Sequence, residues 1–160
     1  MDVRRLRPDE ADLLRDVRLR ALADTPWAYG STHAREAGYP PERWQWFADQ
    51  HESVIFVAVE DGAAHGMAGG FCPEPDVVML WGMWVAQDAR GRGLGRALVE
   101  SVIGWARERG AAAIRLEVTD AEQARTAAAL YRSLGFAPTG ERSSLDSDPA
   151  LETIMMTRSP

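Results

Sequence analysis

The pattern of hydrophobic and polar positions predicts an alternation of strands and helices in the first part of the chain. Residues 3–7 form a short predicted strand, and a helix is expected after Pro8 and Asp9. The apolar face of this helix carries Leu14, Val17, Ala21 and Leu22. Residues 25–31 end this predicted helix and form a loop that is unusually rich in aromatic side chains. A second short helix is then predicted from Pro40 and Pro41, with Trp44, Phe47 and Ala48 at helical spacing.

Three strand-like runs come next, and the last of them is almost wholly apolar. Residues 54–59 are rich in β-branched side chains, and Asp61-Gly62 predicts a hairpin turn into residues 64–71. Residues 77–85 read Val-Val-Met-Leu-Trp-Gly-Met-Trp-Val. Such a run is typical of a central strand that is covered on both faces.

In the second half of the chain, the hydrophobic positions first follow a helical period, and predicted strands and helices then alternate again. A long helix is expected to carry a stripe formed by Leu94, Leu98, Val102 and Trp105 and to stop at Gly110. Residues 114–118 predict a strand, and residues 119–123 offer two overlapping capping boxes. The helix that they should start carries Ala127, Leu130, Tyr131 and Leu134 and ends at Gly135. A loop around residues 143–148 and a closing strand at 151–156 complete the pattern.

These elements predict an α/β (α+β) fold with a mixed, largely antiparallel sheet flanked by helices. A helix joins strand 77–85 to strand 114–118, so these two strands should run parallel, whereas the hairpins before them are antiparallel. The chain has 160 residues and no repeat or low-complexity linker, and we expect one domain over residues 1–160.

Composition narrows the function classes. Hydrophobic residues make up 46% of the chain and charged residues 26%, which is typical of a globular protein. No apolar run approaches the roughly 20 residues of a membrane span, and no signal segment opens the chain, so a cytoplasmic protein without membrane contact is expected. Cys72 stands alone, and His33, His51 and His65 are scattered. We therefore expect no disulfide, no metal site and no catalytic role for these four residues.

Two residue types are missing altogether. The chain has 18 arginines but no lysine, and it has no asparagine, a bias that a GC-rich genome explains. The absence of lysine excludes a Walker phosphate loop and a Schiff-base mechanism. The net charge of −6 disfavours a nucleic-acid partner and favours a cationic small molecule or basic peptide.

The most informative segment is a glycine- and arginine-rich turn at residues 87–96, between the apolar strand and the long helix. Its glycines are Gly91, Gly93 and Gly95, and its arginines are Arg90, Arg92 and Arg96. Glycines let a ligand approach the backbone, and the first amides of a helix attract anions. The turn therefore predicts a pyrophosphate site, the alternative being a plain turn with solvated arginines. The spacing of these glycines differs from the Gly-x-Gly-x-x-Gly pattern of dinucleotide-binding proteins, so the turn does not predict a dinucleotide site.

Three motifs together resemble the GNAT superfamily of acetyl-CoA-dependent N-acetyltransferases. They are Arg90-x-x-Gly93-x-Gly95 after Met83-Trp84-Val85, then Leu116-Glu117-Val118, then Leu130-Tyr131-x-x-x-Gly135-Phe136. The resemblance implies a splayed sheet, with the pantetheine arm of acetyl-CoA between two parting strands. It implies that the loop Gly91, Arg92, Gly93, Leu94, Gly95 and Arg96, next to Arg90, binds the pyrophosphate. It also implies that the backbone of Met83, Trp84 and Val85 holds the pantetheine and the acetyl carbonyl.

The chain departs from the family pattern at two positions. Family members often have asparagine seven residues before the helix tyrosine, where this chain has Ala124. Gln123 or Glu122 could replace it in holding the pantetheine, although helix capping explains both equally well. Some members carry an acidic base on the central strand, and residues 77–85 contain none.

Two residues are candidates for moving protons when an amine attacks a thioester. Tyr131 lies on the core-facing side of its predicted helix, and the resemblance assigns it the protonation of the leaving thiolate; a core aromatic is the alternative. Glu117 interrupts an apolar strand. It resembles the Leu-Glu-Val glutamate that acts as a base in ribosomal-protein N-terminal acetyltransferases. The alternative is a structural carboxylate paired with an arginine across the sheet, in which case water would relay the proton.

The acceptor site is expected in the aromatic segment before the core motifs, with Trp27 and Tyr29 as its contacts. Trp44 and Trp46 belong to the same region. Packing of an amphipathic helix against the core explains Trp44 as well as contact with the acceptor does. The predicted function is transfer of the acetyl group of acetyl-CoA to a primary amine, on a small molecule or peptide, by direct attack in a ternary complex without a metal. The alternative is a non-catalytic acyl-CoA-binding module. The oligomeric state stays open, with a homodimer as one option.

Overall fold

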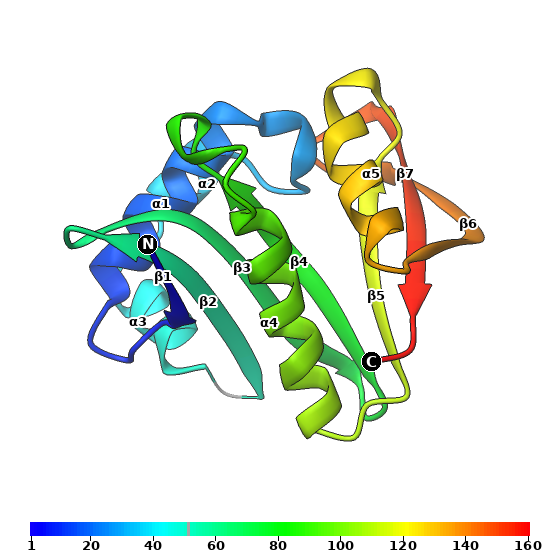
Figure 1. Cartoon of the computed structure of the whole chain (residues 1–160). Coiled ribbons are helices and arrows are strands. Elements are labelled where there is room, and N and C mark those ends of the chain that lie inside the picture. The colour runs from blue at the N-terminus through cyan, green and yellow to red at the C-terminus, as the bar shows by residue number, and fades with distance from the viewer. Residues whose placement is uncertain (51) are drawn as a thin grey trace.

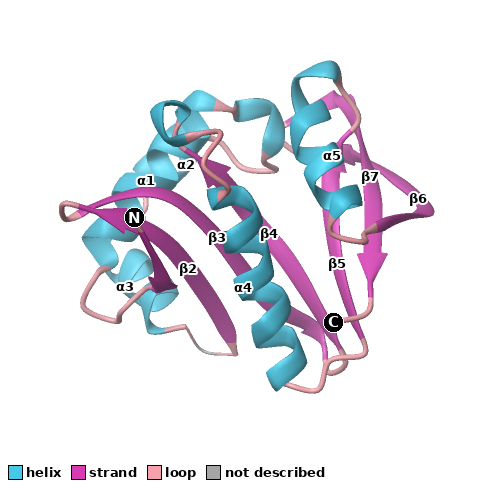
Figure 2. Ribbon diagram, viewed as in Figure 1, coloured by secondary structure: helices cyan, strands magenta, loops and turns pink. Residues whose placement is uncertain are grey.

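The computed structural model describes residues 1–50 and 52–160, which form a seven-stranded sheet with helices on both faces (Figures 1 and 2). The strands are β1 (Asp2–Arg5), β2 (Ser53–Glu60), β3 (Ala63–Glu74), β4 (Val77–Val85), β5 (Ala113–Thr119), β6 (Ala137–Leu145) and β7 (Asp148–Arg158). The helices are α1 (Ala11–Asp24), α2 (His33–Ala37), α3 (Pro41–Asp49), α4 (Leu94–Glu108) and α5 (Arg125–Ser133). Short 3-10 turns are η1 (Pro26–Ala28), η2 (Gln87–Ala89) and η3 (Glu122–Ala124). His51 lies outside the described residues.

The sheet is mixed and splayed, as predicted. Its order is β1-β2-β3-β4-β5-β7-β6, and every neighbouring pair is antiparallel except β4 and β5. Those two strands pair in parallel only from Val77 opposite Ala113 to Met79 opposite Arg115. Figure 1 shows them diverging beyond this point. The sheet is therefore open between the second half of β4 and the end of β5.

The helices cover the sheet through the apolar stripes that the sequence predicts. On one face, α4 buries Leu98, Val102 and Trp105 against the strands. On the other face, α1 buries Leu14, Val17, Ala21 and Leu22, and α3 adds Trp44 and Ala48. Asp61 and Gly62 both have positive φ, as a tight hairpin turn between β2 and β3 requires. No helix in the described part of the chain is long and apolar enough to cross a membrane.

Strand β4 contains an irregularity next to the opening. Met67 of β3 faces Trp84 and Gly69 faces Trp81, so β4 has one residue more than β3 over this stretch. Gly82 lies in the extra length with a φ of +67°, a conformation that favours glycine. Such a β-bulge redirects the backbone locally. In this protein the bulge lies in the part of β4 that does not pair with β5.

Two predictions about local structure are wrong, and one short helix was not predicted. The capping boxes at 119–123 do not form, because Ala124 precedes α5 without a side-chain cap and the hydroxyl of Thr119 donates to the Trp27 carbonyl at 2.6 Å. The loop expected around residues 143–148 is a hairpin of β6 and β7, whose outer strand is exposed throughout except at Leu145 and so shows no buried alternation. Helix α2 escaped prediction because it is only five residues long.

Candidate active site

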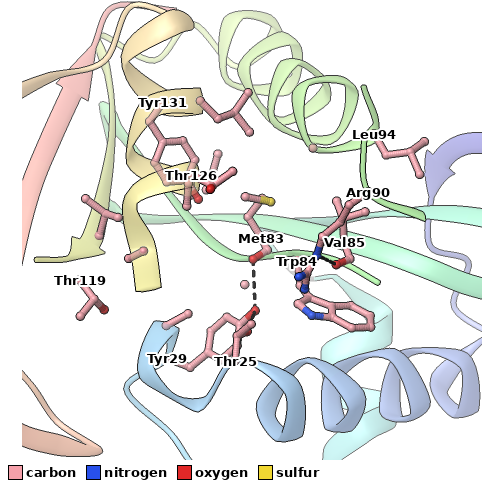
Figure 3. A pocket seen from close by; sticks show the side chains of 18 of the residues that line it. Thr25, Tyr29, Met83, Trp84, Val85, Arg90, Leu94, Thr119, Thr126 and Tyr131 are labelled. Carbon is pink, nitrogen blue, oxygen red and sulfur yellow. Dashed lines mark hydrogen bonds between the residues drawn. The ribbon is translucent and has the colours of Figure 1, made fainter. Parts of the chain in front are cut away.

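A cavity of about 500 Å³ lies where β4 and β5 part. The cavity is lined by residues of the segment 25–29 after α1, of β4, of the glycine turn, of β5, and of η3 and α5, and Figure 3 shows several of their side chains. The predicted site residues among them are Trp27, Tyr29, Met83, Trp84, Val85, Arg90, Gly91, Gly93, Leu94, Gly95, Arg96, Glu117, Gln123 and Tyr131. Arg92 is not among the lining residues. It is exposed, and its Nη2 lies 3.4 Å from the Asp88 carbonyl oxygen.

The glycine turn forms one end of the cavity with a backbone that only glycine adopts easily. Gly91 and Gly93 have φ angles of +80° and +79°, and a Cβ added at either would meet no atom within 4 Å. Gly93 precedes the first turn of α4 and provides no side-chain cap. The opening amides of α4 therefore have no side-chain acceptor and lie at the positive end of the helix dipole, which suits an anion.

Gly95 differs from the other two glycines. It has a helical conformation, and a Cβ there would lie 3.2 Å from Cδ2 of Leu130 on α5. That separation is closer than a side chain normally tolerates, so Gly95 lets α4 and α5 approach each other. From the sequence, only a ligand-binding use is predicted for this glycine, and its packing against α5 is not.

The arginines of this segment are held by protein groups. Arg90 donates from Nε to the Val85 carbonyl at 3.0 Å and from Nη2 to Asp24 at 2.6 Å. Arg96 donates to the Ser133 hydroxyl at 2.8 Å and lies 3.8 Å from Glu100. Both charges are therefore paired with carboxylates, and the opening amides of α4 remain as the groups at this end that attract an anion.

Tyr131 reaches from α5 into the cavity (Figure 3). Its side chain is buried, and its ring meets Phe136 edge-on, with 6.0 Å between ring centres. Burial raises the pKa of Tyr131 above its ordinary value, and the nearby Tyr29 acts in the same direction. The phenol is therefore neutral and carries its proton throughout the physiological range.

Glu117 is the exposed member of an otherwise buried stretch of β5, between Leu116 and Val118. Glu117 is one of the residues that line the cavity. Within residues 1–50 and 52–160, no arginine forms an ion pair with it, so the expected alternative of a cross-strand pair is not observed. Its carboxylate is available to a ligand.

The aromatic residues before the core motifs occupy different places. The Tyr29 hydroxyl donates to the Met83 carbonyl at 3.2 Å and meets Thr25, and burial raises the pKa of Tyr29 to about 12. Trp27 is half-buried at the cavity, whereas Trp44 is a core residue. Trp46 is exposed away from the cavity, so neither of these last two lines it.

Trp81 lines the cavity although it is not among the predicted site residues, because its place in the apolar run 77–85 indicates only a core position. Its indole lies over Gly69, where a Cβ would collide with the ring. The Arg18 guanidinium lies 5.4 Å from its centre and 4.9 Å from that of Tyr29. Together these contacts fix the aromatic wall of the cavity.

The cavity crosses the sheet. Met83, Gly95 and Leu130 line it on the face covered by α4 and α5, and Tyr29 and Trp81 line it on the face covered by α1. One end therefore offers amides and arginines, and the other a carboxylate among aromatic rings. Among the described residues, no group of three His, Cys, Asp or Glu side chains could hold a metal ion.

The motif order and this geometry agree with a comparison against family models. The model of the acetyltransferase (GNAT) family matches residues 18–136. The chain belongs to this acetyltransferase family. GNAT proteins use acetyl-CoA as their acetyl donor.

Solved structures of GNAT proteins share the whole fold at low sequence identity. A ribosomal-protein-alanine N-acetyltransferase from Brucella melitensis is 23% identical, with a TM-score of 0.79 over 100% of both chains. A GNAT acetyltransferase from Streptococcus pneumoniae is 17% identical, with a TM-score of 0.81 over 99% of both. The yncA protein of Salmonella typhimurium, solved with its cofactor acetyl-CoA, is 18% identical, with a TM-score of 0.81 over 99% of this chain and 93% of that one. No curated protein matches the sequence. These similarities establish the fold and leave the acceptor open.

Proposed function

We propose that this GNAT protein transfers the acetyl group of acetyl-CoA to a primary amine by direct attack in a ternary complex. The observation that carries the proposal is the polarity of the cavity. An uncapped helix start with glycines lies at one end, and Glu117, whose carboxylate has no ion pair among the described residues, lies at the other. A donor with a pyrophosphate and an acceptor with an ammonium would be attracted to opposite ends.

The residues present fit acetyl-CoA. The space beside Gly91 and Gly93 is empty where side chains would stand, as a pyrophosphate lying on backbone amides requires. The main chain of residues 83–85 runs along the unpaired edge of β4, where the pantetheine arm can lie between the parted strands. Gln123 also lines the cavity and is the candidate replacement for the missing asparagine.

The proposed proton transfers use Tyr131 and Glu117. The neutral phenol of Tyr131, whose pKa is raised by burial, protonates the thiolate that leaves. Glu117, alone or through water, takes a proton from the acceptor's ammonium and leaves the neutral amine. This amine attacks the thioester, the C–N bond forms as the C–S bond breaks, and the second proton of the nitrogen passes to the solvent. An α-amine with a pKa near 8 costs roughly 1 kcal/mol to deprotonate at pH 7, and a lysine about 4–5 kcal/mol. The acceptor's own pKa therefore decides how much base catalysis the enzyme needs.

The acceptor is an amine on a small molecule or peptide that enters between Trp27, Trp81 and Glu117. The test is a panel of small amines and peptides incubated with acetyl-CoA and the full chain, with products identified by mass spectrometry. A stably acetylated amine supports the proposal. Binding of acetyl-CoA without turnover of any amine would favour the non-catalytic acyl-CoA-binding module instead.

Glu117→Gln is expected to cause a defect in kcat/KM that shrinks as pH rises. At high pH the free amine becomes abundant, so a base is less needed, and an acceptor of low pKa should be affected less than one of high pKa. The measurement is the pH–rate profile of the variant beside the wild type. Glu60→Gln is the matched control, because Glu60 is also an exposed strand glutamate and does not line the cavity. An unchanged acidic limb in Glu117→Gln would mean that Glu117 takes no part in deprotonation.

A further inference from the structure

One carboxylate oxygen joins α1 to two separate parts of the cavity wall. Oδ2 of Asp24, the last residue of α1, accepts from Nε1 of Trp84 at 2.9 Å and from Nη2 of Arg90 at 2.6 Å. Trp84 belongs to the pantetheine side of the proposed site, and Arg90 directly precedes the glycine turn. These donors lie 60 and 66 residues away in the chain.

Arg90 completes the connection between the two parts. Its Nε donates to the Val85 carbonyl, and Figure 3 shows the guanidinium beside that oxygen. The Trp84 indole is buried, and the Arg20 guanidinium lies 5.3 Å from its ring centre, so the ring has little freedom to turn. The end of β4 and the start of the glycine turn are thus fixed to each other and to α1.

We propose that Asp24 is a positioning residue for the cofactor site. It holds the β4 edge and the glycine turn at the separation that coenzyme A needs to contact both, and Arg90 acts as the brace between them rather than as a phosphate ligand. The inference rests on the proposed binding of acetyl-CoA along this wall. A site that is ordered beforehand spares the ligand the cost of ordering it.

The sign of the effect distinguishes positioning from simple charge. Asp24 carries a negative charge close to where a polyanion should bind, so removing it should tighten binding if charge alone mattered. Removing a positioning residue should weaken binding, because Trp84 and Arg90 lose their shared acceptor. Loss of hydrogen bonds to one charged group corresponds to a decrease in affinity of roughly tenfold or more.

The experiment is calorimetric titration of coenzyme A into the full chain, wild type and Asp24→Ala. We expect the Kd to rise about tenfold or more in Asp24→Ala, with a matching rise in the KM for acetyl-CoA and a smaller change in kcat. Asp12→Ala is the matched control. It removes the same charge from the same helix, where Asp12 is exposed and belongs to no ion pair of the described residues, and its Kd should stay at the wild-type value.

A second variant keeps the test decisive if Asp24→Ala folds poorly. Trp84→Phe keeps a buried ring and removes the donor to Asp24 together with the five-membered part of the indole, so it should also raise the Kd. Where Asp24→Ala folds, the losses in the double variant Asp24→Ala/Arg90→Ala, compared with Asp24→Ala and Arg90→Ala alone, should be non-additive, since both residues act through one connection. Additive losses would show that Arg90 binds phosphate by itself and would overturn the inference.

The failure of this inference can be told apart from failure of the proposed function. Unchanged or tighter binding by Asp24→Ala, beside a wild type that binds coenzyme A, overturns the positioning role alone. A wild-type chain that does not bind coenzyme A overturns the proposed function and the positioning role with it.

Discussion

Valine at position 93 is expected to abolish measurable coenzyme A binding while the fold survives. Gly93 has a φ of +79° at the start of α4, and its missing side chain leaves the space that the proposed pyrophosphate occupies. A branched Cβ there would block that space, and the strained backbone would turn the first amides of α4 away from it. The measurement is calorimetric titration of coenzyme A into the variant and the wild type.

Gly110→Val is the control that distinguishes loss of the binding site in Gly93→Val from the effect of backbone strain alone. Gly110 lies just past the other end of α4 with a φ of +71°, and nothing lies within 4 Å of its Cβ position. Its substitution carries a similar conformational cost far from the cavity, so this variant should bind coenzyme A with wild-type affinity. Equal affinities for Gly93→Val and the wild type would show that the cofactor does not lie on this turn.

Removing the Tyr131 hydroxyl is expected to lower kcat by roughly ten- to a thousandfold, within or just below the usual range for general acid catalysis. The affinity for acetyl-CoA should change little, because the phenylalanine ring keeps the edge-on contact with Phe136. The measurements are kcat with a responsive acceptor and the Kd for acetyl-CoA in Tyr131→Phe. Tyr39→Phe is the control: Tyr39 packs on Trp44 and Phe47, away from the cavity, and its loss of a hydroxyl should leave kcat unchanged.

The raised pKa of Tyr131 gives this prediction a pH dependence. An acid must carry its proton to act, and burial keeps the phenol protonated beyond the usual tyrosine value of about 10. The wild-type rate should therefore show no decline from Tyr131 ionisation below about pH 10. A kcat in Tyr131→Phe equal to that of the wild type would assign this tyrosine to the core alone.

The sequence predicts the fold well where the hydrophobic residues of a helix or strand recur with a regular period and pack against the core. The stripe Leu94, Leu98, Val102 and Trp105 and the apolar run of β4 each specify both the element and its burial. Strand β6 could not be predicted, because it lies at the sheet edge and buries only Leu145. Its polar sequence reads as a loop when only local pattern is considered.

The candidate site was predictable as far as its motifs are local. Gly91 and Gly93 predict the turn, because positive φ favours glycine. The apolar stripe of α5 predicts that Tyr131 points toward the core. The contacts of Asp24 with Trp84 and Arg90 carry no such signal, because they join side chains far apart in the chain. The same holds for Tyr29, whose hydroxyl bonds to the Met83 carbonyl.

Glu117 shows what the sequence leaves undecided. A glutamate within an apolar strand is consistent with a base or with a structural ion pair, and spacing cannot separate the two. The structure places its side chain at the cavity with no ion-pair partner among the described residues. That placement depends on where β4 and β5 part, which is a property of the whole sheet.

The most direct test of the account measures release of free thiol from acetyl-CoA by the full chain, with and without an acceptor amine. Direct attack in a ternary complex predicts that thiol appears only when the amine is present, in a one-to-one ratio with the N-acetylated product. Mass spectrometry should then detect no acetylated protein before the amine is added. A burst of thiol together with acetylated protein in the absence of amine would contradict direct attack, and absence of release with every amine would contradict the enzymatic function itself.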